Sequence, residues 1–296
     1  MKIDLVNPPR TYIDRSEIAP PLGLMRLAAV GQSCGIETSI TDFNLLCHTD
    51  RALMNCEDFY SRSLGYLLNK NADVYCFTSM AVDTHIAIHL ARLLKKELPK
   101  TVIVVGGAHF SSIAKAVIEK FPWIDFVVTG EGEEFIKKLP HSLKELKLHS
   151  VIEGSPLGTS GVGNLPFDLV DLNLYFSVNP TRCLDFETGR GCRFKCAFCY
   201  SPTHYSGFRN FSIDNVIAGL RNATELGFKS VFFVEDNFLN DPARAADLCR
   251  EIENASLDLT WQSYVTFPQF QVKIIAPQFL VIHGREHFQR CKICHL

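Results

Sequence analysis

The feature that most constrains the fold is an alternation of short apolar runs with helical segments over residues 1 to about 150. Continuous apolar runs at residues 74–80 and 102–105 are typical of strands buried on both faces of a sheet. Residues 2–6, 37–43 and 126–128 indicate three further strands. Strands that alternate with helices form parallel sheets covered on both faces, so this half is predicted to be a doubly wound α/β domain.

Two helices between these strands have clear boundaries. Residues 21–34 carry apolar side chains at helical spacing and end at Gly35, and a second amphipathic helix from about Ile86 ends before Pro99. Residues 133–139 are predicted to form a short exposed helix that Pro140 stops.

The carboxyl ends of the strands are the expected ligand edge of such a sheet. Glycines in these loops let backbone approach a ligand closely, although a glycine after a strand is also common in ordinary turns. The candidate ligand-binding residues in these loops are Pro8, Ser79, Gly106, Gly107, Gly130, Glu131 and Gly132.

Three cysteines in the second half, Cys192, Cys196 and Cys199, have the spacing CxxxCxxC. Gly189 and Gly191 before them and Pro202 after them indicate a loop, which disfavours a buried helical stripe of cysteines. A structural zinc site completed by His204 and an iron–sulfur cluster are the other interpretations. Iron–sulfur clusters usually take four thiolates, so a three-cysteine set leaves one iron with an open position.

With the aromatic Phe198 just before the last cysteine, this motif resembles the signature of radical S-adenosylmethionine enzymes. The resemblance implies a 4Fe-4S cluster whose unique iron chelates S-adenosylmethionine, with Phe198 against the adenine. It also implies reductive cleavage to methionine and a 5'-deoxyadenosyl radical, with electrons from an external donor such as flavodoxin or ferredoxin.

The order of motifs in residues 1–150 resembles the cobalamin-binding domain of one branch of that family. Many corrin-binding domains carry Asp-x-His-x-x-Gly after the first strand, but residues 7–10 here contain no histidine. Asp83-Thr-His85 begins similarly, yet Ile88 stands where glycine is required, so His85 and His89 are interpreted as helix-surface residues. The resemblance then implies either cobalamin held without a histidine ligand or no cobalamin.

Residues 151–178, rich in Gly, Ser and Pro at their start, are predicted to be a linker, and residues 179–266 a partial (β/α) barrel. Strands are expected at 182–187, 230–234 and 257–265, with helices that begin after Ser212 and at Pro242. The family resemblance implies that Glu235, with Asp236 and Asn237, accepts hydrogen bonds from the methionyl ammonium group. Ser263 and Tyr264 are further candidates to face the cofactor.

Residues 267–296 show no steady period and are predicted to be an irregular tail. Only three or four strand–helix units are therefore expected, which would leave an open strand edge. The chain is expected to be a fragment, a degenerate copy, or one that self-associates through that edge. The spacing of Cys291-x-x-Cys294-His295 matches that of a c-type haem attachment site. A zinc or second-cluster ligand pair and a tail without function are the other interpretations.

Composition limits the remaining function classes. A net charge of −2 predicts no nucleic-acid partner, and the sequence shows no apolar run long enough to span a membrane. Eleven cysteines without secretory features indicate the reducing cytoplasm. The leading hypothesis is a radical S-adenosylmethionine methyltransferase that uses cobalamin and acts on a small-molecule or peptide substrate. The alternatives are a cobalamin-free cyclase or rearrangement enzyme, an inactive copy, and a zinc-stabilised binding module.

Overall fold

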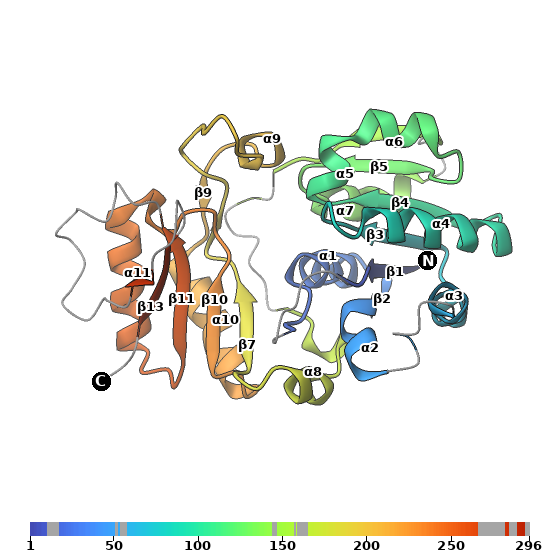
Figure 1. Ribbon diagram of the computed structural model, residues 1–296. Helices are drawn as coiled ribbons and strands as arrows, with labels where there is room; N and C mark the ends of the chain where they lie inside the picture. Colours follow the sequence, from blue (N-terminus) through green and yellow to red (C-terminus); the bar gives the residue numbers. More distant parts are fainter. Residues whose placement is uncertain are drawn as a thin grey trace. The chain divides into compact units, whose positions relative to one another are not determined.

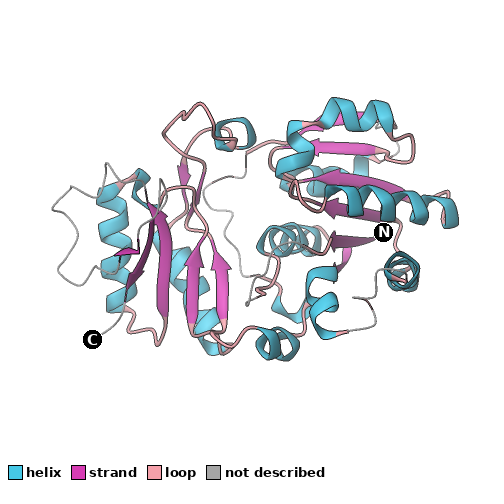
Figure 2. Cartoon of the chain, viewed as in Figure 1, coloured by secondary structure: helices cyan, strands magenta, loops and turns pink. Residues whose placement is uncertain are grey.

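The computed structural model divides into two compact units, residues 1–157 with 165–178 and residues 158–164 with 179–296. The structure describes residues 1–10, 18–50, 53, 58–143, 147–156, 158, 165–265, 282–283 and 289–293 (Figures 1 and 2). Within these ranges, no helix combines the length and the apolar character needed to cross a membrane.

Six parallel strands form the sheet of the first unit, in the order β2-β1-β3-β4-β5-β6 (Figure 1). They are β1 (Lys2–Asn7), β2 (Glu37–Asp42), β3 (Val74–Thr78), β4 (Val102–Gly106), β5 (Phe126–Thr129) and β6 (Ser150–Glu153). The five predicted strands and the doubly wound class are confirmed. β6, at the start of the predicted linker, pairs with β5 and becomes an edge of the sheet.

Helices flank this sheet: α1 (Leu22–Ser33), α2 (Phe43–Thr49), α3 (Phe59–Lys70), α4 (Thr84–Glu97), α5 (Ala108–Ser112), α6 (Ala114–Lys120), α7 (Glu133–Ser142) and α8 (Leu172–Val178). A 3-10 turn, η1 (Phe167–Leu169), precedes α8. The core joins β3 and β4 to one stripe of α4, where Ile86, Leu90 and Leu94 belong to the same buried cluster as Phe77. This is the stripe that the helical spacing predicts.

The prediction for residues 133–139 was wrong in two respects. The helix α7 continues to Ser142 with Pro140 inside it, and Phe135, Ile136 and Leu139 are buried. Its apolar residues lie at i, i+1 and i+4, so one face packs onto the unit, while Lys137 and Lys138 are exposed.

The second unit contains a five-stranded sheet in the order β12-β13-β11-β10-β7. β7 (Cys183–Phe186), β10 (Ser230–Phe233) and β11 (Thr260–Val265) are parallel, as predicted. The expected irregular tail differs from the structure here: β13 (Gln289–Ile293) pairs antiparallel with β11, and β12 (Ile282–His283) pairs with β13. Among the described residues the sheet remains open, with β12 and β7 as its edge strands. The rest of residues 267–296 lies outside the described residues.

The helices of this unit begin where the sequence predicts. Ser212 caps α10 (Ile213–Glu225), accepting from the Asn215 backbone N–H at 3.4 Å. Asp241 caps α11 (Pro242–Asn254), accepting from Arg244 N–H at 3.2 Å. The short helix α9 (Ser201–His204), the turn η2 (Phe238–Asn240) and a two-stranded ribbon of β8 (Gly189–Arg190) and β9 (Arg209–Asn210) complete the unit.

The register of the sheet decides which loops meet. Phe186 at the end of β7 pairs with Phe233 at the end of β10. The loops that follow, which contain Thr188 and Glu235, therefore leave the sheet at the same level. Thr188 and Glu235 therefore lie beside each other at the carboxyl ends of β7 and β10.

Candidate functional site

The cysteine loop, residues 191–200, leaves the β8–β9 ribbon and consists of turns rather than a helix. The interpretation as a buried helical stripe is therefore wrong. Cys192 and Cys199 are half-buried, Cys196 is exposed, and all three are free thiols. The backbone N–H of Cys199 donates to Cys196 O at 3.0 Å, and the ring of Phe198 is 80% exposed.

Two glycines form the base of the cysteine loop. Gly191 has φ +78°, and a Cβ atom there would lie 2.1 Å from Gly207 O. A Cβ atom at Gly189 would lie 2.6 Å from Arg209 O. The Gly-rich segment before the first cysteine is thus required by the close approach of the two strands of the ribbon.

In the described residues, no three Cys, His, Asp or Glu side chains are gathered into a group that would hold a metal ion. The three thiols share one loop without forming such a group among the described residues. His204, which the zinc interpretation requires, packs its ring against Tyr205 at 4.6 Å between centroids.

Glu235 lies at the end of β10 and is 8% exposed. Its Oε1 accepts a hydrogen bond from the Thr188 backbone N–H, and its Oε2 has no hydrogen-bond partner among the residues that the structure describes. Burial raises the pKa of this carboxyl to about 7, and the nearby Glu187 adds to the rise. A cationic group beside Oε2 would favour the ionised carboxylate.

The two other residues of the predicted acidic motif have different surroundings. Asp236 is half-buried, and its Oδ2 accepts from Ser201 Oγ at 2.5 Å. Asn237 is 1% exposed, and its Nδ2 donates to Asn240 Oδ1 at 3.5 Å. Both side chains therefore engage the polypeptide around the cysteine loop.

Asn240 is a residue that sequence reasoning missed. It is 3% exposed and donates from Nδ2 to Gly191 O at 3.2 Å. Its Oδ1 accepts from Arg193 N–H at 3.2 Å and from the Cys192 thiol at 3.3 Å. In the sequence, its position three residues after Asn237 of the acidic motif was the feature that could have marked it as part of the site.

A buried ion pair, also missed, lies under the cysteine loop. Arg190 Nε and NH2 donate to the two carboxylate oxygens of Glu187 at 2.9 and 3.0 Å, and both side chains are almost fully buried. Arg244 donates to the carbonyl oxygens of Thr188 and Phe211 at 3.1 and 2.7 Å. These contacts join α11 to the strands that lead into the loop.

The first unit brings the predicted edge residues together at the carboxyl ends of its strands. Pro8 and Ser79 are buried, and Ser79 Oγ lies 3.0 Å from Thr84 Oγ1. Gly107, with φ +95°, leaves no room for a side chain beside Thr78 and Ser79. The remaining members follow β4 and β5: Gly106 and Gly132 are half-buried, Glu131 is buried, and Gly130 N–H donates to Ser111 Oγ at 3.0 Å.

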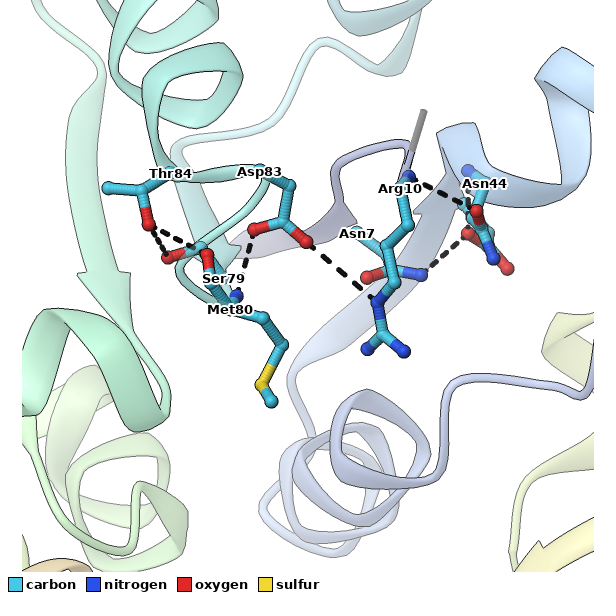
Figure 3. A network of polar contacts seen from close by, with 8 residues as sticks. Asn7, Arg10, Asn44, Ser79, Met80, Asp83 and Thr84 are labelled. Atoms are coloured by element: carbon cyan, nitrogen blue, oxygen red, sulfur yellow. Dashed lines mark hydrogen bonds and ion pairs between the residues drawn. The ribbon is translucent and has the colours of Figure 1, made fainter. Parts of the chain in front are cut away.

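A polar network spans the position where the strand order reverses, between β1 and β3 (Figure 3). Arg10 N–H donates to Asn44 Oδ1 at 3.2 Å, and Arg10 Nε lies 3.8 Å from Asp83 Oδ2. Asp83 also accepts from Met80 N–H at 2.8 Å, and burial raises the pKa of its carboxyl to about 6. Open α/β sheets bind ligands at such switch points.

The histidines of α4 lie where the sequence predicts, on the outer side of the helix. His85 is exposed. The half-buried His89 packs on Tyr60 with ring centroids 4.2 Å apart, and burial lowers the pKa of its imidazole. Of the two remaining candidates on β11, Ser263 is buried and Tyr264 contacts the ring of Phe232. Cys291 is in β13, whereas Cys294 and His295 lie outside the described residues.

Comparison with protein families matches both units separately. The B12 binding domain family matches residues 13–139, and the radical SAM superfamily matches residues 186–292. The second match continues past Phe267, through the segment for which the sequence pattern indicated no regular structure. The predicted family and its domain order are confirmed.

The chain is similar to several curated methyltransferases. It is 26% identical to an uncharacterized methyltransferase of Pyrococcus horikoshii, across 93% of this chain and 62% of that protein. It is 28% identical to the hopanoid C-3 methylase of Methylococcus capsulatus, across 80% of this chain and 46% of that protein. The chain thus spans about half of the length of the relatives it matches.

Among solved structures, the fold is similar to the radical S-adenosylmethionine methyltransferase TsrM of Kitasatospora setae. The TM-score is 0.65 at 18% identity, across 86% of this chain and 51% of that one. That structure contains tryptophan substrate and a S-adenosylmethionine analogue, and a second TsrM structure contains cobalamin and a [4Fe-4S] cluster. The chain belongs to the radical SAM superfamily and carries a B12 binding domain ahead of its radical SAM domain.

Proposed function

We propose that Cys192, Cys196 and Cys199 bind a 4Fe-4S cluster with one open iron, at which the chain binds and reductively cleaves S-adenosylmethionine. Three free thiols on one loop are the donor set that such a cluster takes from protein. When bound and reduced, the cluster supplies the electron that breaks a carbon–sulfur bond of S-adenosylmethionine. The role of the protein is to bind, orient and shield the reacting groups.

The observation that carries the proposal is Glu235 Oε2, which no donor in the described part of the chain reaches. This Oε2 is buried at the carboxyl end of β10, while Oε1 is held by the Thr188 N–H. A buried carboxylate oxygen without a donor favours a cationic ligand, and the methionyl ammonium group is one. Asp236 and Asn237 flank this position, and the exposed ring of Phe198 is available to stack on the adenine.

We infer that the first unit binds cobalamin at the carboxyl edge of its sheet, without a histidine ligand from residues 7–10. The switch point between β1 and β3 and the glycines after β4 and β5 support this assignment. The hopanoid C-3 methylase and TsrM, which was solved with tryptophan substrate, support methyl transfer to a small molecule; a peptide substrate is the alternative. An external donor such as flavodoxin or ferredoxin supplies the electrons, in the cytoplasm.

Anaerobic reconstitution tests the cluster. We expect about four irons with matching sulfide, and 5'-deoxyadenosine from S-adenosylmethionine under a strong reductant. Cys199→Ala abolishes both, whereas Cys34→Ala, at an exposed free thiol of the first unit, leaves both unchanged. Stoichiometric zinc, or a loaded cluster without cleavage, would contradict the proposal.

The visible spectrum of the protein after incubation with hydroxocobalamin and gel filtration tests the second cofactor. We expect a retained corrin spectrum that is unchanged in the His85→Ala variant, because His85 is an exposed residue of α4. A protein that cleaves S-adenosylmethionine but retains no corrin would favour a cobalamin-free cyclase or rearrangement enzyme instead.

A further inference from the structure

Asn240 has a buried amide whose hydrogen bonds go mainly to the cysteine loop. Nδ2 donates to the carbonyl oxygen of Gly191, and Oδ1 accepts from the N–H of Arg193, each at 3.2 Å. These two backbone groups belong to the residues immediately before and after Cys192. The side-chain amide of Asn240 is therefore hydrogen-bonded to the backbone on both sides of Cys192.

The second partner of Oδ1 is the Cys192 thiol itself, at 3.3 Å. Metal binding replaces the thiol proton, and a thiolate has no hydrogen to donate. The two backbone hydrogen bonds do not depend on that proton and keep the amide in its orientation. The contribution of Asn240 to the metal-bound state is thus made through the backbone of Gly191 and Arg193.

A purely local role for Asn240 does not explain these contacts. The N-terminus of α11 is capped by Asp241, whose carboxylate accepts from the Arg244 N–H. The remaining side-chain contact of Asn240 comes from Asn237, at 3.5 Å. The buried amide is therefore not required to cap the helix that it precedes.

We propose that Asn240 is a positioning residue that presets Cys192 for cluster binding by holding the backbone on both sides of that cysteine. The inference rests on the proposed cluster at the three cysteines. Partners of metal ligands of this kind are typically worth tenfold or more in metal affinity. Asn240→Leu, close in volume, removes every one of these hydrogen bonds, and Asn240→Asp keeps the acceptor for Arg193 but loses the donor to Gly191.

The first experiment uses the full chain without metal and does not depend on the proposed function. Each cysteine is alkylated with iodoacetamide under native conditions and quantified by peptide mass spectrometry. We expect Asn240→Leu to raise the rate at Cys192 about fivefold relative to Cys196, since hydrogen bonds that restrain Cys192 are lost. Asn254→Leu, at an exposed asparagine of α11, leaves the ratio unchanged.

The second experiment follows iron loss from the reconstituted protein to a chelator. We expect about tenfold faster loss for Asn240→Leu, a smaller increase for Asn240→Asp, and none for Asn254→Leu. If Asn240→Leu does not fold, the same two measurements on the near-isosteric Asn240→Asp decide.

The inference would be overturned if the Asn240 variants had lower thermal stability but unchanged rates of Cys192 alkylation and of iron loss. Asn240 would then have a structural role alone. Failure of the wild-type chain to bind a cluster would contradict the proposed function instead. The alkylation ratio then still decides whether Asn240 restrains Cys192.

Discussion

Tyr175 donates a hydrogen bond of 2.6 Å from its phenol to Asp42 Oδ2, across 133 positions of sequence. Both side chains are buried, and Asp42 also accepts from Asn7 Nδ2 at 2.8 Å and from Asn44 N–H at 3.0 Å. The contact fastens α8 to the carboxyl end of β2. Burial raises the pKa of the Asp42 carboxyl even though these hydrogen bonds oppose the rise.

Tyr175→Phe is expected to destabilise the first unit by about 1–3 kcal/mol, because a buried carboxyl loses a donor. Urea unfolding in a Trp261→Phe background measures this, since Trp123 is then the one tryptophan and lies in the first unit. Tyr66→Phe is the matched control: its phenol bonds Asp50 at 3.3 Å on the surface, so its loss is expected to cost less than about 0.5 kcal/mol. If both variants lowered the free energy of unfolding equally, burial of the Tyr175–Asp42 hydrogen bond would not explain its contribution to stability.

The stability of the metal-free second unit is expected to fall as pH rises from about 4.5 to about 7. The pKa of Glu235 is raised to about 7 in the folded chain, so folding retains a proton that the unfolded chain releases earlier. The full effect is on the order of 3 kcal/mol. Urea unfolding followed by Trp261 fluorescence in a Trp123→Phe background measures it; Glu235→Gln removes this component, and Glu251→Gln, at an exposed position, retains it.

Binding of S-adenosylmethionine to the cluster-loaded protein is expected to release a proton near pH 6.5 and to tighten as pH rises through about 7. The ammonium group favours the ionised form of Glu235, whose pKa burial holds at about 7 without the ligand. Calorimetry in two buffers of different ionisation enthalpy counts the proton. Glu235→Gln weakens binding and loses the pH dependence; a pH dependence that persists in this variant would assign it to another group.

Gly191→Ala is expected to cost about 1–3 kcal/mol more than Gly207→Ala, because its new Cβ meets backbone and cannot be accommodated. The two glycines have nearly the same φ, +78° and +79°, but a Cβ at Gly207 meets nothing within 4 Å. The comparison therefore separates the clash with Gly207 O from the cost of a left-handed backbone. Trp261 fluorescence during urea unfolding provides the measurement, and equal losses would place Gly207 O further away than described.

Arg190→Met is expected to destabilise the second unit by about 3–5 kcal/mol, because Glu187 is then left buried without its partner. The double variant Glu187→Leu with Arg190→Met removes both charges and is expected to recover most of that loss. The same unfolding assay applies. If the double variant were as unstable as the single one, the ion pair would also be needed to maintain the backbone conformation of residues 187–190.

Local patterns in the sequence determined much of the architecture and the family. Apolar runs and helical spacing predicted the five strands and the helix α4, since burial on a strand or helix follows the side-chain period. Ser212 and Asp241 were identifiable as caps because the groups they bond lie within one turn. The spacing of Cys192, Cys196 and Cys199, with Phe198 before the last cysteine, resembled the signature of the radical SAM superfamily, whose family model matches residues 186–292.

The tertiary structure alone decided which distant groups meet. Asn240 reaches Gly191 across 49 positions and Tyr175 reaches Asp42 across 133. No local period encodes such pairs, because they depend on strand order and on the register that brings β7 and β10 to the same level. The pairing of β13 with β11 and the burial of α7 are decided in the same way, by surfaces that exist only once the sheets have formed.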